Sequence, residues 1–584
     1  MPAGRRLHLG TTPHSRGLLP SFDPAASHSA FRAKGGCHDT GLPRLARASG
    51  PGRYNRQPGD CRMIRRLLAG TLVASIPMLT RTLVTAAAPA DCATLVSLTI
   101  PDVTINAATT VAPGSFTPPG AQTAMTLPGF CRVEATARPT SDSEIKVEVW
   151  IPPAEAWNGK FQGVGNGGYQ GSISYTAMAT ALRRGYATAS TDTGHTGDDV
   201  RFGQGHPEKV IDYGHRAVHV MTEAAKLVIR NASGRFAERS YFVGCSAGGH
   251  QALSEAQRYP GDYDGIVAGA PANNRIRQTF GFLASWIATH DAAGAPLLTP
   301  AKLALLTRSA TAACDANDGL KDGLIDDPRR CTFDPATLAC KAGADETSCL
   351  SAPQVAAVQR MYEGTKSPKT GALIYTGWPR GSEAFGETAN QGWRQYVTDP
   401  KEPSRVGVFK YFLFHNPSWD FRTIDWDRDL AYAEQQLPHL AAVDTNLAPF
   451  KQRGGKLLVY MGWADPVVPP QTAVAYYDGV VKTMGGLAST QDFYRLFMAP
   501  GMGHCSGGPG PNQFDAVAAL EQWVEKGVAP NQLIATHSTG GKVDRSRPLC
   551  AYPKVARYKG AGSTDDAANF TCVAPPAPPA PRPR

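Results

Sequence analysis

The feature that most constrains the fold is an alternation of short apolar runs with longer helical stretches, which begins near residue 145. The apolar runs have the length and the β-branched or aromatic content of buried strands. Seven of them are expected to be strands: residues 145–151, 160–164, 186–190, 240–243, 265–268, 456–461 and 494–498. Strands that alternate with helices form a mostly parallel sheet covered on both faces. The chain is therefore predicted to be an α/β protein.

Gly-rich or polar turns follow several of these expected strands. They lie at residues 165–168, 192–195, 244–248, 462–465 and 501–504. Sites in open α/β sheets form beyond the carboxyl ends of the strands, so these turns should converge on one crevice.

The turn at residues 244–248 reads Gly-Cys-Ser-Ala-Gly and fits the G-x-S-x-G pattern of a nucleophile elbow. It follows an apolar run and precedes a helical stretch over residues 251–259, which is the context that this motif requires. Glycines suit it because the turn is sharp and side chains there would collide with neighbouring backbone. Ser246 is therefore the candidate nucleophile, although Gly/Ser-rich turns also occur without a catalytic role.

A serine hydroxyl is a weak nucleophile until a histidine removes its proton, and a carboxylate orients that histidine. Among fourteen histidines, His504 is favoured because it lies in a Gly-rich turn after the last expected strand. Asp465 lies in the equivalent turn after the strand before it. The order Ser246, Asp465, His504 is that of the α/β-hydrolases. The alternative is that Asp465 is an Asx-turn residue and His504 an ordinary loop histidine.

Twelve cysteines are present, and ten of them lie beyond residue 62. An even number in an exported chain indicates a disulfide framework, although parity alone does not assign the pairs. Sequence spacing suggests Cys92 with Cys131, Cys314 with Cys331, Cys340 with Cys349 and Cys550 with Cys572, which leaves Cys245 and Cys505. A disulfide holds two Cα atoms about 5.5 Å apart. A Cys245–Cys505 bond would therefore fasten the serine turn to the histidine turn, which strengthens the triad hypothesis.

Backbone N–H groups should stabilise the oxyanion of the tetrahedral intermediate. The amide of Ala247, directly after the nucleophile, is one expected donor. Gly167 or Gly168, in the turn after an early strand, is the candidate for the other. The alternative for this turn is a purely structural role.

The beginning of the chain predicts export. Met63 opens a segment with two arginines, an apolar run over residues 67–79 and small residues up to Ala90, the layout of a secretory signal peptide. The apolar run is too short to cross a bilayer, so no membrane association is expected and the protein is predicted to be secreted or periplasmic. Residues 1–62 lack periodicity and are predicted to be a disordered extension or a misassigned start.

The net charge of +10 does not predict a nucleic-acid partner. Residues 1–62 carry ten Lys/Arg against three Asp/Glu, and residues 63–90 add three arginines, so the remainder is near neutral. No electrostatic footprint for a polyanion is left. The oligomeric state stays open.

The strand–helix alternation stops between residues 273 and 449, where Trp, Pro, Asp and four cysteines gather. This segment is predicted to be an inserted lid domain. Residues 91–272 and 450–572 then form an α/β-hydrolase catalytic domain, so the predicted fold class is an α/β-hydrolase fold with a large inserted lid. Residues 573–584 repeat Pro and Ala and are expected to be a flexible tail.

The chain resembles the tannase and feruloyl esterase family from about Cys92 to Cys572. The resemblance is carried by Gly-Cys-Ser-Ala-Gly-Gly from residue 244, by the motifs at residues 256–260 and 264–271, by the Asp-Thr-Gly-His turn from residue 192, and by the cysteine spacing. It implies a secreted serine carboxylester hydrolase that acts on a small ester of an aromatic, phenolic acid. Ala247 and His250 depart from the residues typical of this family, which concerns substrate preference rather than the triad.

The resemblance also implies a structural calcium ion in the lid. Asp315, Asp318 and Asp322, with the backbone carbonyls of Leu320 and Leu324, are similar to the calcium loop of the family. Carboxylates that alternate with free carbonyls suit calcium better than magnesium, although a solvated Asp/Gly-rich turn is the alternative.

Two rival functions remain on the sequence evidence. A serine peptidase of the same fold could use the same triad, and a binding protein could retain the fold without chemistry.

Overall fold

The computed structural model describes residues 91–169, 171–385, 392–397, 402–403 and 405–575. The leader, the expected signal peptide and most of the expected tail therefore lie outside the described residues. The described residues fall within one compact unit.

A nine-stranded mixed sheet forms the centre of the structure, in the order β1-β4-β5-β7-β6-β8-β9-β12-β13. In this order, each pair of neighbouring strands from β7 through β6, β8, β9 and β12 to β13 is parallel. The remaining pairs, β1 with β4, β4 with β5 and β5 with β7, are antiparallel. The strands of this sheet are β1 (Val103–Val111), β4 (Phe130–Ala137), β5 (Ile145–Ile151), β6 (Lys160–Val164), β7 (Ala187–Thr191), β8 (Arg239–Cys245), β9 (Gly265–Gly269), β12 (Lys456–Gly462) and β13 (Tyr494–Ala499). All seven strands expected from the sequence are confirmed, with ends that shift by no more than two residues.

The sequence pattern missed β1 and β4, which extend the antiparallel side of the sheet. β1 is an edge strand, and among its residues only Ile105 is buried, so it lacks the apolar run of an interior strand. The small two-stranded sheets are formed by β2 (Gly114–Phe116) with β3 (Met125–Leu127), β10 (Thr365–Lys366) with β11 (Leu373–Tyr375), β14 (Gln532–Thr539) with β15 (Lys542–Cys550), and β16 (Val555–Tyr558) with β17 (Phe570–Val573).

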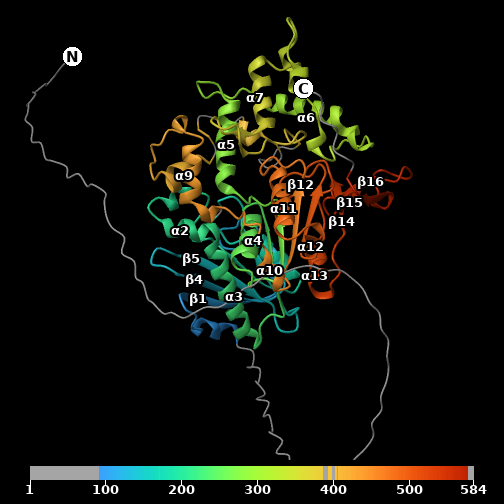
Figure 1. The fold of residues 1–584 in the computed structure, drawn as a ribbon. Helices are drawn as coiled ribbons and strands as arrows, with labels where there is room; N and C mark the ends of the chain where they lie inside the picture. Colours follow the sequence, from blue (N-terminus) through green and yellow to red (C-terminus); the bar gives the residue numbers. More distant parts are fainter. Residues whose placement is uncertain (1–90, 170, 386–391, 398–401, 404, 576–584) are drawn as a thin grey trace, which may run out of the picture. The chain divides into compact units, whose positions relative to one another are not determined.

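Helices cover both faces of the central sheet (Figure 1). Successive side chains of a strand point to opposite faces. On β8, Tyr241 packs in a cluster with Leu520 of α13, whereas its neighbour Phe242 packs in a cluster with Leu253 of α4. The α-helices are α1 (Tyr175–Arg183), α2 (Pro207–Ile211), α3 (Ala217–Ser233), α4 (Ala247–Arg258), α5 (Arg275–Thr289), α6 (Pro300–Cys314), α7 (Ala352–Glu363), α8 (Arg394–Val397), α9 (Arg428–Gln436), α10 (Ala448–Gln452), α11 (Gln471–Thr483), α12 (Leu487–Gln491) and α13 (Ala516–Lys526).

The segment predicted as the lid contains α5 to α9 and supplies most of a second apolar cluster, to which Val210 and Tyr213 also belong. Phe280, Trp286, Phe409 and Phe412 belong to that cluster. Phe282 instead joins the large cluster of the central sheet. Because α5 contributes to both clusters, it links the insertion to the sheet (Figure 1).

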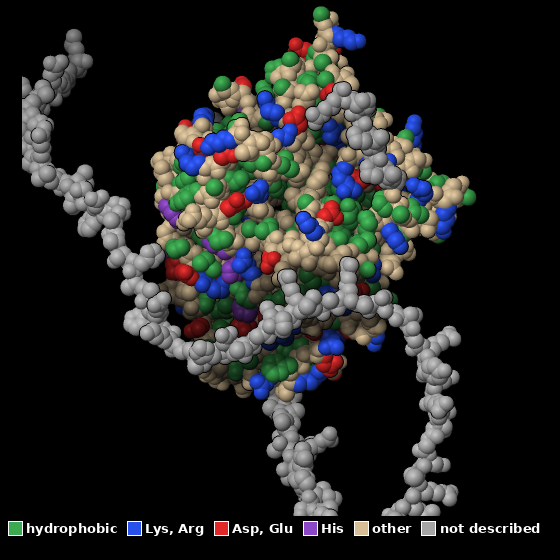
Figure 2. All heavy atoms as spheres, in the orientation of Figure 1, with side chains coloured by type: hydrophobic (Ala, Val, Ile, Leu, Met, Phe, Trp, Pro, Cys, Tyr) green, Lys and Arg blue, Asp and Glu red, His purple; other side chains and the backbone are tan. Residues whose placement is uncertain are grey.

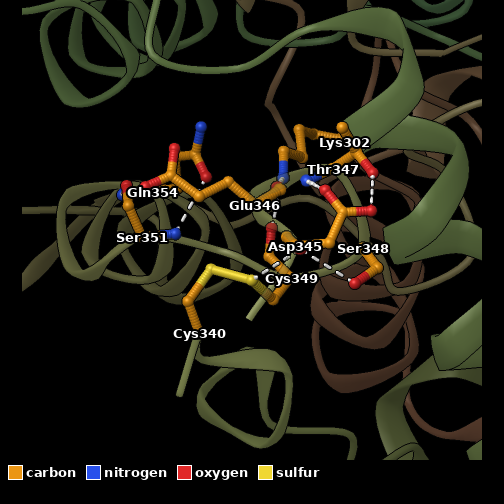
Figure 3. Close-up of a disulfide and its surroundings, with 9 residues drawn as sticks. All are labelled: Lys302, Cys340, Asp345, Glu346, Thr347, Ser348, Cys349, Ser351 and Gln354. Atoms are coloured by element: carbon orange, nitrogen blue, oxygen red, sulfur yellow. Dashed lines mark hydrogen bonds between the residues drawn. A yellow bond between two sulfur atoms is a disulfide. The ribbon is translucent and has the colours of Figure 1, made fainter. Parts of the chain in front are cut away.

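All five predicted disulfides are present: Cys92–Cys131, Cys245–Cys505, Cys314–Cys331, Cys340–Cys349 and Cys550–Cys572. Figure 3 shows how local contacts hold the shortest loop, which Cys340 and Cys349 close. The ammonium of Lys302 donates to the carbonyls of Glu346 and Cys349. The carboxylate of Asp345 accepts from Thr347 N–H at 2.8 Å. This loop is thus tied to α6 as well as closed on itself.

No helix among the described residues combines the length and the apolarity needed to cross a bilayer. On the face shown in Figure 2, Lys and Arg side chains are interspersed with Asp and Glu rather than gathered into one patch.

Candidate active site

Ser246 lies on a sharp turn between β8 and α4. Its φ of 64° and ψ of −117° place it in a region that residues other than glycine rarely adopt. A Cβ atom on Gly244 would lie 2.3 Å from the carbonyl oxygen of Gly248, and one on Gly249 would lie 2.3 Å from that of Gly269. The strained serine and its close-packed glycines are the geometry of a nucleophile elbow.

Ser246, His504 and Asp465 form one hydrogen-bonded chain. Ser246 Oγ lies 2.8 Å from His504 Nε2, and His504 Nδ1 lies 2.8 Å from Asp465 Oδ2. Since a carboxylate only accepts, Nδ1 carries the proton of the neutral ring, and Nε2 is left to accept from the serine hydroxyl. This is the arrangement in which the histidine can act as a base towards the serine.

The Asp465 side chain is held in a fixed orientation. Its residue is completely buried, and its other oxygen, Oδ1, accepts from the N–H groups of Val467 at 2.7 Å and Val468 at 2.8 Å. These bonds satisfy the buried carboxylate and aim Oδ2 at His504. The turn after β12 therefore brings the Asp465 carboxylate within hydrogen-bond reach of His504.

The Cys245–Cys505 disulfide joins the residue before Ser246 to the residue after His504. The two Cα atoms are 6.0 Å apart, although the residues are 260 positions apart in the chain. The serine turn after β8 and the histidine turn after β13 are therefore covalently linked beside the Ser246–His504 hydrogen bond.

The turn after β6 packs directly against the elbow. A Cβ atom on Gly165 would lie 2.8 Å from Gly248 Cα, and Asn166 N–H donates to Gln251 of α4 at 2.9 Å. Ala247 begins α4, so its N–H is one of the first-turn donors that a helix leaves without an internal partner. This places both candidate oxyanion elements beside Ser246.

The two glycine candidates differ in their surroundings. Gly168 has a φ of +59°, and its carbonyl accepts from Arg275 at 3.0 Å and from the Tyr213 hydroxyl at 3.3 Å. A Cβ atom on Gly167 would meet nothing within 4 Å. That one of these two glycines donates its N–H to the oxyanion stays a prediction.

The Asp-Thr-Gly-His turn supports the same loop. His195 Nε2 lies 2.6 Å from the carbonyl oxygen of Tyr169, and the ring stacks on Phe202 with centroids 3.8 Å apart. Burial lowers the pKa of His195, which favours the neutral ring. Asp192 Oδ1 accepts from Gly194 N–H at 2.9 Å and so stabilises the turn itself. This turn therefore positions the loop rather than joining the triad.

Known proteins resemble the chain over most of its length. The family model described as tannase and feruloyl esterase matches residues 131–573. An uncharacterized esterase of Xanthomonas campestris pv. campestris is 40% identical over 87% of this chain and 95% of its own length. The mono(2-hydroxyethyl) terephthalate hydrolase of Piscinibacter sakaiensis is 36% identical over 81% of this chain and 89% of its own length.

The chain belongs to the tannase and feruloyl esterase family. The crystal structure of feruloyl esterase B from Aspergillus oryzae superposes with a TM-score of 0.77 at 29% identity, over 83% of this chain and all of that one. The predicted α/β-hydrolase fold is therefore confirmed. This family member is a carboxylic ester hydrolase.

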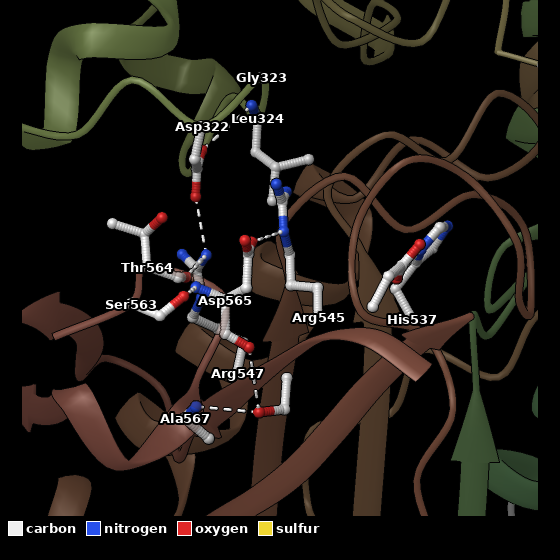
Figure 4. Close-up of polar contacts among 12 residues, drawn as sticks. Asp322, Gly323, Leu324, His537, Arg545, Arg547, Ser563, Thr564, Asp565 and Ala567 are labelled. Atoms are coloured by element: carbon white, nitrogen blue, oxygen red, sulfur yellow. Dashed lines mark hydrogen bonds and ion pairs between the residues drawn. The ribbon is translucent and has the colours of Figure 1, made fainter. Parts of the chain in front are cut away.

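In this esterase the Asp-rich loop over residues 314–327 is held by several hydrogen bonds, and Figure 4 shows Asp322 of this loop facing Arg547. Asp322 pairs with Arg547 at 2.7 Å, and Asp315 accepts from the N–H groups of Asp322 and Gly323 at 3.0 and 3.1 Å. Asp318 accepts from Leu320 N–H at 3.0 Å, and Asp322 from Leu324 N–H at 3.2 Å. All five residues named from the sequence are thus held together in one loop.

The donor chemistry of this loop fits calcium in part. Burial, with repulsion from neighbouring carboxylates, raises the pKa of Asp326 to about 7 and also raises that of Asp318, as expected where negative charge lacks a counterion. However, no three His, Cys, Asp or Glu side chains of the described residues converge into a metal cage. The Asp322 carboxylate is also engaged by Arg547. The calcium ion stays a prediction.

Sequence reasoning missed the residues that shape the surroundings of the triad. It named no lid residue as a binding residue, and it gave no role to Asn166 or Arg275. Asn166 holds the loop after β6 through its side-chain NH₂, which donates to the carbonyls of Ser172 and Thr191, both at 2.8 Å. No local motif marks such residues, because their role depends on neighbours that are distant in the chain.

Proposed function

We propose that this esterase is a secreted serine carboxylester hydrolase that cleaves esters of aromatic acids through a covalent acyl-enzyme. Ser246 is the nucleophile, His504 the general base and Asp465 the residue that orients the histidine. The observation that supports this most is the continuous hydrogen-bond chain from Ser246 to Asp465.

In the first half of the reaction, His504 Nε2 takes the proton of Ser246 as Oγ attacks the ester carbonyl carbon. Asp465 stabilises the imidazolium and keeps Nδ1 protonated. The N–H of Ala247 and one N–H of the Gly167–Gly168 turn stabilise the oxyanion. When the intermediate collapses, the bond to the alcohol oxygen breaks, and His504 returns its proton to the leaving alcohol.

In the second half, a water molecule takes the place of the alcohol. His504 removes a proton from the water, the resulting hydroxide attacks the acyl carbon, and the carboxylic acid leaves as Ser246 regains its proton. No redox cofactor is needed, since the net reaction is hydrolysis.

The substrate class and the compartment rest on two further observations. Family members are named for feruloyl esters and a terephthalate ester, and the insertion places aromatic side chains around α5. Aromatic rings bind other rings by offset stacking or edge contacts. The five disulfides favour an oxidising compartment, in line with the expected signal peptide over residues 63–90.

The triad is tested by substitution together with active-site labelling. Ser246→Ala and His504→Ala should each lower ester hydrolysis by about 10⁴-fold or more, with nearly unchanged thermal midpoints, because they remove the nucleophile or the base. Asp465→Asn should lose somewhat less. A fluorophosphonate probe should label the wild type and a Ser418→Ala control, in which an exposed serine is replaced, but not Ser246→Ala.

Wild-type rates in any triad variant would remove that residue from the mechanism. The choice between esterase and peptidase follows from kcat/KM on matched galloyl, feruloyl and terephthalate monoesters and on the corresponding anilides. Faster cleavage of the anilides would favour the peptidase.

A further inference from the structure

The histidine turn, residues 501–508 after β13, carries the general base of the triad. It reads Gly-Met-Gly-His-Cys-Ser-Gly-Gly, so half of its residues have no side chain to pack. Gly503 N–H donates to the Gly507 carbonyl at 2.9 Å, which closes the turn around His504. Glycine leaves a backbone more conformational freedom than any other residue. The position of His504 therefore depends on the neighbours that pack against this turn.

The turn after β12 holds part of this backbone. Ala464 N–H donates to the Met502 carbonyl at 3.0 Å, and a Cβ atom on Gly462 would lie 2.2 Å from that carbonyl oxygen. The Cys245–Cys505 disulfide restrains the residue that follows His504. Both restraints come from the predicted catalytic domain.

Two side chains of the insertion pack against the same turn. A Cβ atom on Gly503, directly before His504, would lie 2.7 Å from Cε2 and 3.0 Å from Cζ of Phe385. A Cβ atom on Gly501 would lie 2.7 Å from Cδ2 of Leu324. The Phe385 ring and the Leu324 side chain therefore occupy the space that larger residues at these two positions would need. The insertion thus contacts the backbone that leads into His504.

Phe385 is anchored within the insertion by the residues that precede it. Glu383 is completely buried, and its carboxylate accepts from the hydroxyls of Thr307 at 3.0 Å and Tyr362 at 2.5 Å. Ala384 N–H donates to Thr307 Oγ1 at 2.8 Å. Since Thr307 belongs to α6 and Tyr362 to α7, hydrogen bonds to two helices fix the backbone directly before Phe385. The ring of Phe385 therefore reaches the histidine turn from a well-anchored segment.

We propose that Phe385 is a positioning residue of the esterase reaction, which acts through Gly503 to hold His504 in line with Ser246. This inference rests on the proposed function. His504 Nε2 lies 2.8 Å from Ser246 Oγ, and a shift of about 1 Å at reacting groups lowers a rate by about 100-fold. The disulfide restrains the chain after His504, whereas Phe385, supported by Leu324, restrains the chain before it. The insertion thus takes part in catalysis through the backbone that carries the base.

The experiment measures Phe385→Ala on two esters that share a leaving group and differ in the acyl group, 4-nitrophenyl acetate and 4-nitrophenyl benzoate. Because His504 acts in both halves of the reaction, we expect kcat to fall by about tenfold for both esters while KM changes by less than about threefold. A lost contact with the substrate ring would instead raise KM for the benzoate and spare the acetate. A fluorophosphonate should also label Ser246 about tenfold more slowly, since that step needs the same base.

Phe385→Leu should keep most of the wild-type kcat, because a smaller apolar side chain still fills part of the space beside Gly503. Tyr432→Ala is the matched control: it also removes an aromatic ring from the insertion, but one on α9 that is 42% exposed. It should keep the wild-type kcat and KM for both esters. Phe385 is tested rather than Leu324, because Leu324 also belongs to the candidate calcium loop. All rates are compared per folded protein, well below the thermal midpoint of each variant.

Wild-type kcat in a folded Phe385→Ala variant overturns the proposal. So does a loss confined to KM for the benzoate, which would assign the ring to substrate binding. If Phe385→Ala does not fold, Gly503→Ala tests the same contact from the turn, because its methyl group would meet the ring at 2.7 Å. A normal kcat in that variant overturns the proposal equally. Failure of the proposed function is distinct, since it would appear as ester hydrolysis that persists in Ser246→Ala.

Discussion

At the scale of single residues, the structure depends on how closely backbone segments approach one another at the nucleophile. Gly165 and Gly248 belong to segments more than eighty residues apart, yet they pack so closely that a Cβ atom on Gly165 would lie 2.8 Å from Gly248 Cα. Real Cβ contacts essentially never reach that distance, and the obstacle is backbone rather than a flexible side chain. One added methyl group must therefore displace the loop after β6 or the elbow.

Gly165→Ala is therefore expected to lower kcat/KM by about 100-fold, because a shift near 1 Å at the reacting groups has an effect of that size. Gly261→Ala is the control, since its Cβ would meet only the end of the Arg453 side chain at 3.3 Å. Kinetics on a simple aromatic ester, with circular dichroism to establish folding, provides the measurement. Normal kcat/KM in Gly165→Ala would contradict the close approach.

At the scale of elements, the Cys245–Cys505 disulfide joins two strand-end turns that carry the reacting side chains. Its removal should destabilise the fold by about 5.5 kcal/mol in the chain-entropy model, because the closed loop is long, although measured values often fall short of that. The local effect should be larger for function, because Ser246 and His504 must stay within hydrogen-bond reach.

The Cys245→Ala/Cys505→Ala double variant is expected to lose about tenfold or more in kcat beyond the loss of folded protein, at a temperature where it stays folded. Cys340→Ala/Cys349→Ala is the matched control, because that disulfide closes a nine-residue separation within the insertion. It should leave kcat nearly unchanged. Full kcat in the first double variant would show that the disulfide does not position the triad.

The Asp-rich loop over residues 314–327 is the second element with a testable role. If it binds calcium, chelation should lower the thermal midpoint, since a ligand bound only by the folded state stabilises it by mass action. Asp322→Ala should remove that sensitivity, and Asp345→Ala, which alters an exposed carboxylate of the insertion, should keep it. If elemental analysis of the purified protein finds no calcium, and added calcium does not raise the thermal midpoint, the loop is a solvated turn.

At the scale of the whole molecule, three histidines lie where the catalytic core meets the insertion. His215 lies on the short helical turn η3 (Asp212–Arg216), His250 on α4 and His439 on η10 (Pro438–Leu440). A Cβ atom on Gly214 would lie 2.8 Å from the His439 carbonyl, and Arg258 donates to the carbonyls of Pro438 and Ala441. The ring nitrogens His250 Nδ1 and His439 Nε2 are buried and find no hydrogen-bond partner among the described residues.

Burial, reinforced by Arg258, lowers the pKa of His215 to about 3 and those of His250 and His439 to about 4. Repulsion from neighbouring histidines adds to the effect at His215 and His439. Arg216 adds to the effect at His215, and Glu208 opposes it at His439. An unfolded histidine titrates near pH 6.5, so the unfolded chain binds more protons between about pH 6.5 and 4. The stability that these three histidines contribute should therefore be complete above pH 6.5 and fall with pH below it, by up to about 1.4 kcal/mol per pH unit for each histidine.

Between pH 7.5 and 4.5, the thermal midpoint of His439→Gln should therefore fall less steeply towards acid pH than that of the wild type. His206→Gln is the control, because the side chain of His206 is half exposed and pairs with Asp142 at 2.6 Å. Identical acid-side profiles in His439→Gln and the wild type would contradict the depressed pKa of His439.

Much of the fold and of the candidate site could be predicted from the sequence, because the relevant signals are local or covalent. The interior strands are visible as apolar runs, and β8 with its serine turn is visible as a motif. The pairing of Cys245 with Cys505 brings two distant turns together, since a disulfide allows only a narrow range of Cα separations. β1 was not predicted, because a half-exposed edge strand carries no apolar run.

The sequence by itself thus determined the α/β class, the disulfide pairs and the three residues that the structure joins by hydrogen bonds. Only the tertiary structure decided which glycine packs on the elbow, and that Phe385 of the insertion lies against the residue before His504. The physical reason is that periodicity and turn chemistry act over a few neighbouring residues. The surroundings of a side chain in a packed interior depend instead on segments that meet only once the chain has folded.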